Sequence, residues 1–180
     1  MQLETGVLFA FAAMICWGVG DFLIQRTVRK IGVTEGIAII GIIGSIGLLP
    51  FVWNDLAIVF QPENATLLLG LGFVSFIAAM LCFYAYKVGK LSVIEFVLVI
   101  ELPITVILAT LFFNELLSME QLIVVGIAFA GIVLISVDSL SLRKSNLLEK
   151  GVLVAGMAAL FTGVTSFLTA SAARNISPIL

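Results

Sequence analysis

Three acidic residues lie inside apolar stretches of the chain, and they are the side chains best suited to chemistry within a membrane. They are Asp21, Glu95 and Glu101. A charge near the bilayer centre costs about 2.5–3.5 kcal/mol on insertion scales, so such residues usually face a cavity and mark a substrate or proton pathway. Because removal from water disfavours the anionic form of a carboxyl group, such a side chain could also carry a transported proton.

The three carboxyl groups differ in expected depth. Glu101 lies about ten residues into the run Leu91–Phe113, or about 15 Å deep at the rise of an α-helix. Glu95 is only about four residues in, where it could snorkel to the interface or meet a lysine of the preceding loop. Asp21 lies about one turn from the end of its run. We therefore expect Glu101 to be the most consequential, with a protonated side chain bonded to a neighbouring helix as the structural alternative.

One proline and three aromatic residues are further candidates for the same site. Pro103 follows Glu101 by two positions, removes one helical hydrogen bond and frees a carbonyl. A broken helix beside a buried carboxylate is typical of substrate or ion sites in transporters, although a simple packing kink is the alternative. Trp17 lies mid-run and could line a cavity, and Tyr84 is a second aromatic candidate. Tyr86 is expected to be an interfacial anchor.

The composition indicates a membrane protein. Of the 180 residues, 62% are hydrophobic and 11% are charged, against about 45–50% apolar and 25% charged in a typical soluble domain. A net charge of −2 without a basic arm argues against nucleic-acid binding. The chain has no histidine, no Gly-x-Ser-x-Gly elbow and no Walker A sequence, which argues against an intramembrane enzyme and against direct drive by ATP.

Six apolar runs are long enough to cross the hydrocarbon as helices, since about 20 residues at 1.5 Å each span it. They are Thr5–Gln25, Gly36–Trp53, Thr66–Tyr86, Leu91–Phe113, Met119–Val137 and Gly151–Ala170. Only helices and closed barrels satisfy the backbone in lipid, and the runs do not alternate as barrel strands do. The predicted fold class is an all-α polytopic membrane helix bundle with six spans.

The basic residues predict the orientation. Eight of the nine Lys and Arg follow the first, third and fifth runs, and only Arg174 lies on the opposite face. The positive-inside rule then places the N-terminus outside and those loops in the cytoplasm. We expect a multi-pass protein of the cell membrane, plasma or inner.

A shift of 145 residues superimposes the sixth run on the first, with eleven identities over the twenty-nine positions that begin at Gly6. Gly18 aligns with Gly163, and Arg29 with Arg174. Five spans per unit, an odd number, would make an inverted repeat, as in many secondary transporters. The first unit would be residues 1–140, and 141–180 would hold a linker and the first helix of a truncated second unit.

Two complete units of this length would need roughly 290 residues, twice the shift. On this interpretation the chain is a fragment that holds half of the translocation path. A homodimer is one option, and it would complete the path only if its two chains insert in opposite orientations.

Five parts of the chain follow a pattern that is found together in one family. They are Ala13-Met14-Ile15-Cys16-Trp17-Gly18, Tyr84-Ala85-Tyr86-Lys87, Glu101-Leu102-Pro103, Phe113-Asn114-Glu115-Leu116-Leu117, and the small residues Gly126, Ala130 and Gly131. In these segments the chain resembles the EamA-like permeases of the drug/metabolite transporter superfamily. The resemblance implies ten helices in two inverted repeats, transport of small metabolites or drugs, often outward, and no cofactor. We expect no metal site.

The sequence therefore predicts a secondary transporter, a permease or exporter that works by alternating access, with proton coupling as one option. Its partners would be a small-molecule substrate and the lipid bilayer. Glu101 and Asp21 favour a cationic or amine-bearing solute, or a proton, whereas the aromatic residues would suit an aromatic or amphipathic one. The alternative is a channel or a non-transporting membrane assembly subunit, which saturable flux and counterflow would distinguish from a transporter.

Overall fold

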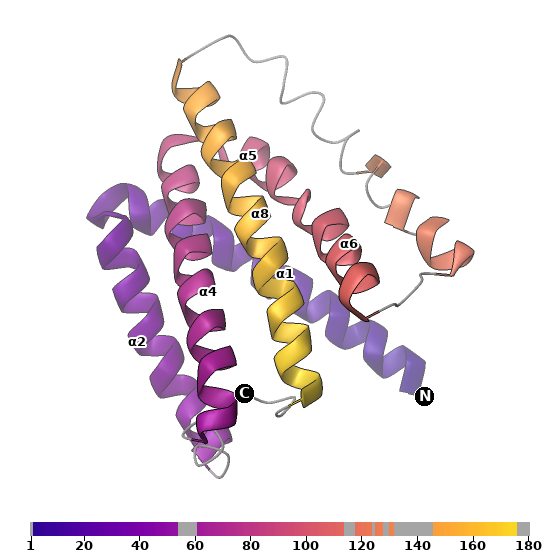
Figure 1. The fold of residues 1–180 in the computed structure, drawn as a ribbon. Coiled ribbons are helices and arrows are strands. Elements are labelled where there is room, and N and C mark those ends of the chain that lie inside the picture. Colours follow the sequence, from indigo (N-terminus) through magenta and orange to yellow (C-terminus); the bar gives the residue numbers. More distant parts are fainter. Residues whose placement is uncertain are drawn as a thin grey trace.

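The computed structural model describes residues 2–53, 61–113, 118–123, 125–127, 130–131 and 146–175, which form helices joined by short turns. These residues contain no strand, in agreement with the predicted all-α class. The helices, labelled in Figure 1, are α1 (Gln2–Ile31), α2 (Val33–Val52), α4 (Pro62–Val88), α5 (Leu91–Leu98), α6 (Glu101–Phe113) and α8 (Asn146–Asn175).

Five helical stretches in the described part of the chain are long and apolar enough to cross a membrane. They are Gly6–Ile31, Val33–Val52, Asn64–Val88, Leu91–Phe113 and Lys150–Arg174. They correspond to five of the six predicted runs, so the protein is a multi-pass membrane protein. The remaining run, 119–137, lies partly outside the described residues, and its described positions are helical.

Helix α1 is longer than the sequence pattern predicted. It continues past Gln25 to Ile31, and its last turn carries basic side chains such as Arg29, which interact favourably with the negative end of the helix dipole. Gly32 then turns the chain into α2 with a φ of 111°, a left-handed conformation that glycine adopts without strain. Asp21 therefore lies ten residues, about 15 Å, from the end of the helix.

The run Leu91–Phe113 is divided into α5 and α6, as expected from its proline. Pro103 has no N–H to donate to the carbonyl oxygen of Val99. The N–H of Leu102 donates to that oxygen instead, at 3.0 Å, in a bond that spans three residues rather than four. The break directly precedes Glu101, so this carboxylate stands at the first residue of α6.

Helix α8 has a central place in the bundle. It packs against α4, α5 and α6, and most extensively against α4, beside which it runs in Figure 1. Small side chains allow the close approach: Ala155, Ala158 and Ala159 have no exposed surface. At Gly163 a Cβ atom would lie 2.7 Å from the Cγ2 atom of Ile104 in α6, so only glycine fits there without movement.

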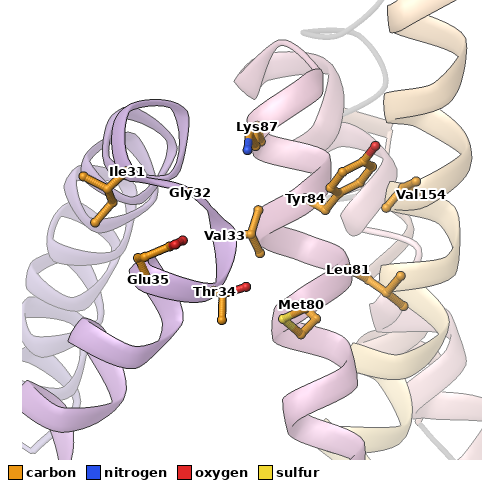
Figure 2. A pocket seen from close by; sticks show the side chains of 10 residues that line it. All are labelled: Ile31, Gly32, Val33, Thr34, Glu35, Met80, Leu81, Tyr84, Lys87 and Val154. Atoms are coloured by element: carbon orange, nitrogen blue, oxygen red, sulfur yellow. The ribbon is translucent and has the colours of Figure 1, made fainter.

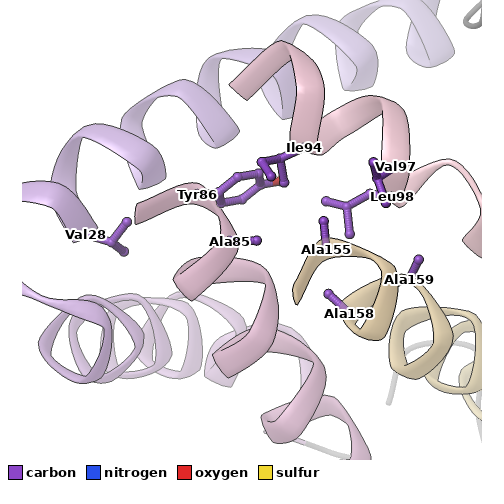
Figure 3. Packing of buried hydrophobic residues seen from close by; sticks show 9 residues of the cluster. All are labelled: Val28, Ala85, Tyr86, Ile94, Val97, Leu98, Ala155, Ala158 and Ala159. Carbon is purple, nitrogen blue, oxygen red and sulfur yellow. The ribbon is translucent and has the colours of Figure 1, made fainter. Parts of the chain in front are cut away.

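A buried apolar cluster occupies one end of the bundle, where α1 and α4 end and where α5 and α8 begin. We call it the turn end, after residues 89–90 between α4 and α5. The cluster, drawn in Figure 3, consists of Val28, Ala85, Tyr86, Ile94, Val97, Leu98, Ala155, Ala158 and Ala159. Tyr86 is only 4% exposed, so its predicted role as an interfacial anchor is wrong. Packing against α5 and α8 buries this ring instead.

Candidate functional site

The structure brings the three predicted carboxylates into one cavity of about 610 Å³. Asp21 comes from α1, Glu95 from α5 and Glu101 from α6, and α4 and α8 supply the remaining wall. We call this space the acidic cavity, because none of the described residues that line it is Lys or Arg. Its other lining residues are Trp17, Gly20, Ile24, Ser75, Ala78, Ala79, Cys82, Phe83, Tyr86, Leu98, Thr162 and Thr165.

Tyr86 binds one of these carboxylates. Its hydroxyl group donates a hydrogen bond of 2.6 Å to Oε1 of Glu95, and Asp21 lines the same cavity. Glu95 therefore faces the cavity and bonds to a tyrosine, rather than snorkelling toward a loop lysine as the sequence suggested.

Glu101 is connected to α8. The hydroxyl group of Ser166 donates to Oε1 of Glu101 at 3.2 Å. The hydroxyl oxygen of Thr105 lies 2.9 Å from the carbonyl oxygen of Glu101 and 3.2 Å from that of Gly163, so its single proton bonds to one of them at a time. These contacts fasten the start of α6, immediately after the helix break, to the middle of α8.

Trp17 lines the acidic cavity as predicted, and with 75% of its surface exposed it stands at the rim. Tyr84 does not reach this cavity. It lines a second cavity of about 720 Å³ between the start of α2 and the face of α4 seen in Figure 2. Residues two apart on a helix point about 200° apart around its axis, so Tyr84 and Tyr86 necessarily face different sides of α4.

The residues of the site differ in part from the predicted candidates. Pro103 breaks the helix but is not among the residues that line the cavity. Tyr86, and not the candidate Tyr84, lines the acidic cavity. The hydroxyl groups of α8 were not singled out at all, although three of them, at Thr162, Thr165 and Ser166, follow one another closely within a single apolar run. That local polarity was the available signal.

The carboxylates surround the cavity without converging on a point. No group of three or more His, Cys, Asp or Glu side chains in the described part of the chain is close enough to hold a metal ion. Three carboxyl groups around one space, whose described lining includes no Lys or Arg, are suited to protons or to a ligand that carries a positive group.

These features define a multi-pass helical membrane protein with a polar cavity beside a broken span. The sequence model of the EamA-like transporter family matches residues 4–137, and the chain belongs to this family, which is part of the drug/metabolite transporter superfamily. It is not an enzyme family. No curated protein and no solved structure gives a match to the chain.

Proposed function

We propose that the protein is a secondary transporter that moves small metabolites or drugs across the cell membrane by alternating access, with the acidic cavity as its substrate site. The observation that carries this proposal is that Asp21, Glu95 and Glu101, from three helices, line one cavity beside a helix break. Discontinuous helices that present polar groups to a cavity at membrane depth are typical of secondary transporters. Membership of a transporter family supports the same function.

The charge of the cavity supports a class of cargo. Carboxylates that repel one another away from water require protons or a cationic partner, and the lining residues supply no Lys or Arg. The cargo would therefore carry an amine or another cationic group, or would exchange for protons. Trp17, Phe83 and Tyr86 could contact an apolar part of it, by ring faces that also attract cations. A volume of about 610 Å³ is in the range of small-molecule sites.

The repeat supports the larger architecture that we propose. Helices α1 and α8 each have 30 residues and are the two helices that the internal alignment pairs. The two helices differ in packing: Gly163 of α8 packs tightly on α6, whereas a Cβ atom at its counterpart Gly18 would have no atom within 4 Å. From the equal lengths and the internal alignment we infer that α8 begins a second, inverted unit. The basic residues support a cytoplasmic turn end and an external N-terminus in the plasma or inner membrane.

Transport in membrane vesicles by the protein with Glu101→Gln tests this function. A carboxylate and a cation 4–6 Å apart interact by about 3–4 kcal/mol at an effective dielectric constant of 20, before the other two carboxylates compensate. We expect saturable uptake and counterflow of amine-bearing compounds by the wild-type protein with both of the proposed repeat units. In the variant, the apparent affinity should fall about tenfold to a hundredfold if Glu101 binds the cation, and the pH dependence should vanish if it carries a proton.

The matched control is Glu120→Gln, which removes the same charge from an exposed position outside the acidic cavity. It should transport as the wild type does. Wild-type affinity and pH response in Glu101→Gln would assign this carboxylate a structural role. Flux that neither saturates nor shows counterflow would indicate the alternative function, a channel or a non-transporting assembly subunit.

A further inference from the structure

Two side chains of α1 hold the turn between α4 and α5. The Nε2 group of Gln25 donates to the carbonyl oxygens of Tyr86, at 3.1 Å, and of Gly89, at 3.2 Å. The Nε group of Arg29 donates to the same oxygen of Tyr86 at 3.2 Å, and its Nη2 group donates to the oxygen of Gly89. Four donor–acceptor contacts thus join segments about 60 residues apart in the sequence. We call this arrangement the clamp.

The geometry of the clamp follows from the two helices that it joins. Gln25 and Arg29 are four residues apart, so they project from one face of α1. The last carbonyl groups of α4 lack partners within their own helix, and they form its negative end, which favours a cation. The planar guanidinium group of Arg29 presents several donors in a fixed fork and can therefore reach two carbonyl oxygens at once.

The clamp lies next to the acidic cavity, because it binds the backbone of Tyr86, a residue that lines this cavity. Beside it, Val28 and Ile94 have no exposed surface, and Figure 3 shows Ile94 against the ring of Tyr86. Tyr86 belongs to both structures: its hydroxyl group faces the cavity and bonds to Glu95, while its carbonyl oxygen accepts from the clamp. The same residue therefore lines the cavity and anchors the turn.

We infer that Gln25 and Arg29 form the gate of the transporter at the turn end, and that Tyr86 couples this gate to the site. The inference rests on the proposed transport function and names how that site is regulated. For the cavity to open at this end, α1 must separate from the α4–α5 turn, and the four clamp contacts must break. A cation that binds Glu95 in place of the hydroxyl group of Tyr86 breaks the hydrogen bond that holds this ring beside the turn. Substrate binding therefore favours opening of the gate.

The two cysteines of the chain provide a reporter that needs no substrate. Cys82 lines the acidic cavity, whereas Cys16 is exposed on α1. In a Cys16→Ser background, the rate at which a membrane-impermeant maleimide modifies Cys82 can be measured from each side, in right-side-out and in inside-out vesicles. With the gate closed, modification should be slow from the turn-end side and faster from the other.

The double variant Gln25→Ala/Arg29→Ala should raise the Cys82 modification rate from the turn-end side by about tenfold or more, because loss of the clamp shifts the population toward the open gate. The rate from the other side should stay the same or fall. Arg29→Lys should give an intermediate increase, since one ammonium group keeps the charge but lacks the fork. Arg26→Ala is the matched control: it removes a charge from the same helix and makes none of the four clamp contacts.

The inference is overturned if the double variant leaves both rates unchanged, if both rates rise equally, as general loosening would cause, or if Arg26→Ala has the same effect. Its failure is distinguishable from failure of the proposed function. A shifted labelling ratio without transport of any amine-bearing compound would uphold the gate and reject the cargo. Transport by the wild type with an unshifted ratio would uphold the function and reject the gate.

Discussion

Substitution of Gly163 by alanine is the sharpest test of the packing that positions Glu101. A Cβ atom at this position would lie 2.7 Å from Cγ2 of Ile104, 2.9 Å from its Cβ and 3.2 Å from the carbonyl oxygen of Glu101. Non-bonded carbon atoms prefer about 3.5–4.0 Å. A rotamer change cannot relieve the contact with the Cβ atom of Ile104, which is fixed to the backbone, so α8 must move away from α6.

The expected magnitude follows from two opposing terms. Overpacking costs typically about 1–3 kcal/mol, while alanine gains about 0.5–1 kcal/mol over glycine inside a helix. The net loss in the free energy of unfolding should be about 1 kcal/mol and at most about 2.5 kcal/mol. Because Ser166 is one turn from Gly163, the same movement should stretch the Ser166–Glu101 hydrogen bond and weaken substrate binding.

Equilibrium unfolding in mixed micelles of a mild and a denaturing detergent measures this loss. Gly156→Ala is the control on the same helix, since nothing lies within 4 Å of its Cβ position, and it should be neutral or stabilising by up to about 1 kcal/mol. A double-mutant cycle with Ile104→Ala should give a coupling energy above about 0.5 kcal/mol, because the nearest clashing atom is removed. Equal stability of the two glycine variants with no coupling to Ile104 would refute the close α6–α8 contact.

Two further predictions concern depth and orientation. Asp21→Asn should lower the apparent substrate affinity by a factor within about threefold of the factor for Glu101→Gln. Both carboxylates line one cavity, and each substitution removes one charge at a similar distance from the substrate. A much smaller effect of Asp21→Asn in the same uptake assay would support the sequence-based expectation that Glu101 is the most consequential of the carboxylates. Single cysteines placed at Asn64 and Ser145 in a cysteine-free background should be labelled by an impermeant reagent from outside only at Asn64, as the positive-inside rule requires, and the reverse pattern would invert the orientation.

The hydrophobicity of the sequence and the position of its prolines predicted a large part of the fold. In a membrane the backbone must satisfy its own hydrogen bonds, so a long apolar run is a helix whatever its neighbours are. The break before Glu101 was equally local, because proline lacks an N–H wherever it stands. The apolar run ends at Gln25, but α1 continues to Ile31. Hydrophobicity does not detect this extension, because the dipole of a helix favours basic side chains in its last turn.

The composition of the site was only partly predictable. The sequence identified Asp21, Glu95 and Glu101 as candidates, because a carboxylate within an apolar run is costly in a membrane whatever the fold is. Which aromatic side chain of α4 faces these carboxylates depends on the rotation of α4 about its axis. That rotation places Tyr86 in the acidic cavity and Tyr84 in the second one, and no feature of the sequence segment Tyr84-Ala85-Tyr86 distinguishes the two.

The sequence by itself determined that this protein is a multi-pass helical membrane protein with carboxylates in its spans and a proline break beside one of them. These properties depend on single residues and their near neighbours. Only the tertiary structure decided that α8 packs through its small residues against α4 and α6, that Ser166 meets Glu101, and that Gln25 and Arg29 reach the α4–α5 turn. The hydrogen bonds among these contacts join residues about 60 positions apart. All of the contacts arise from helix packing and rotation, which local sequence does not encode.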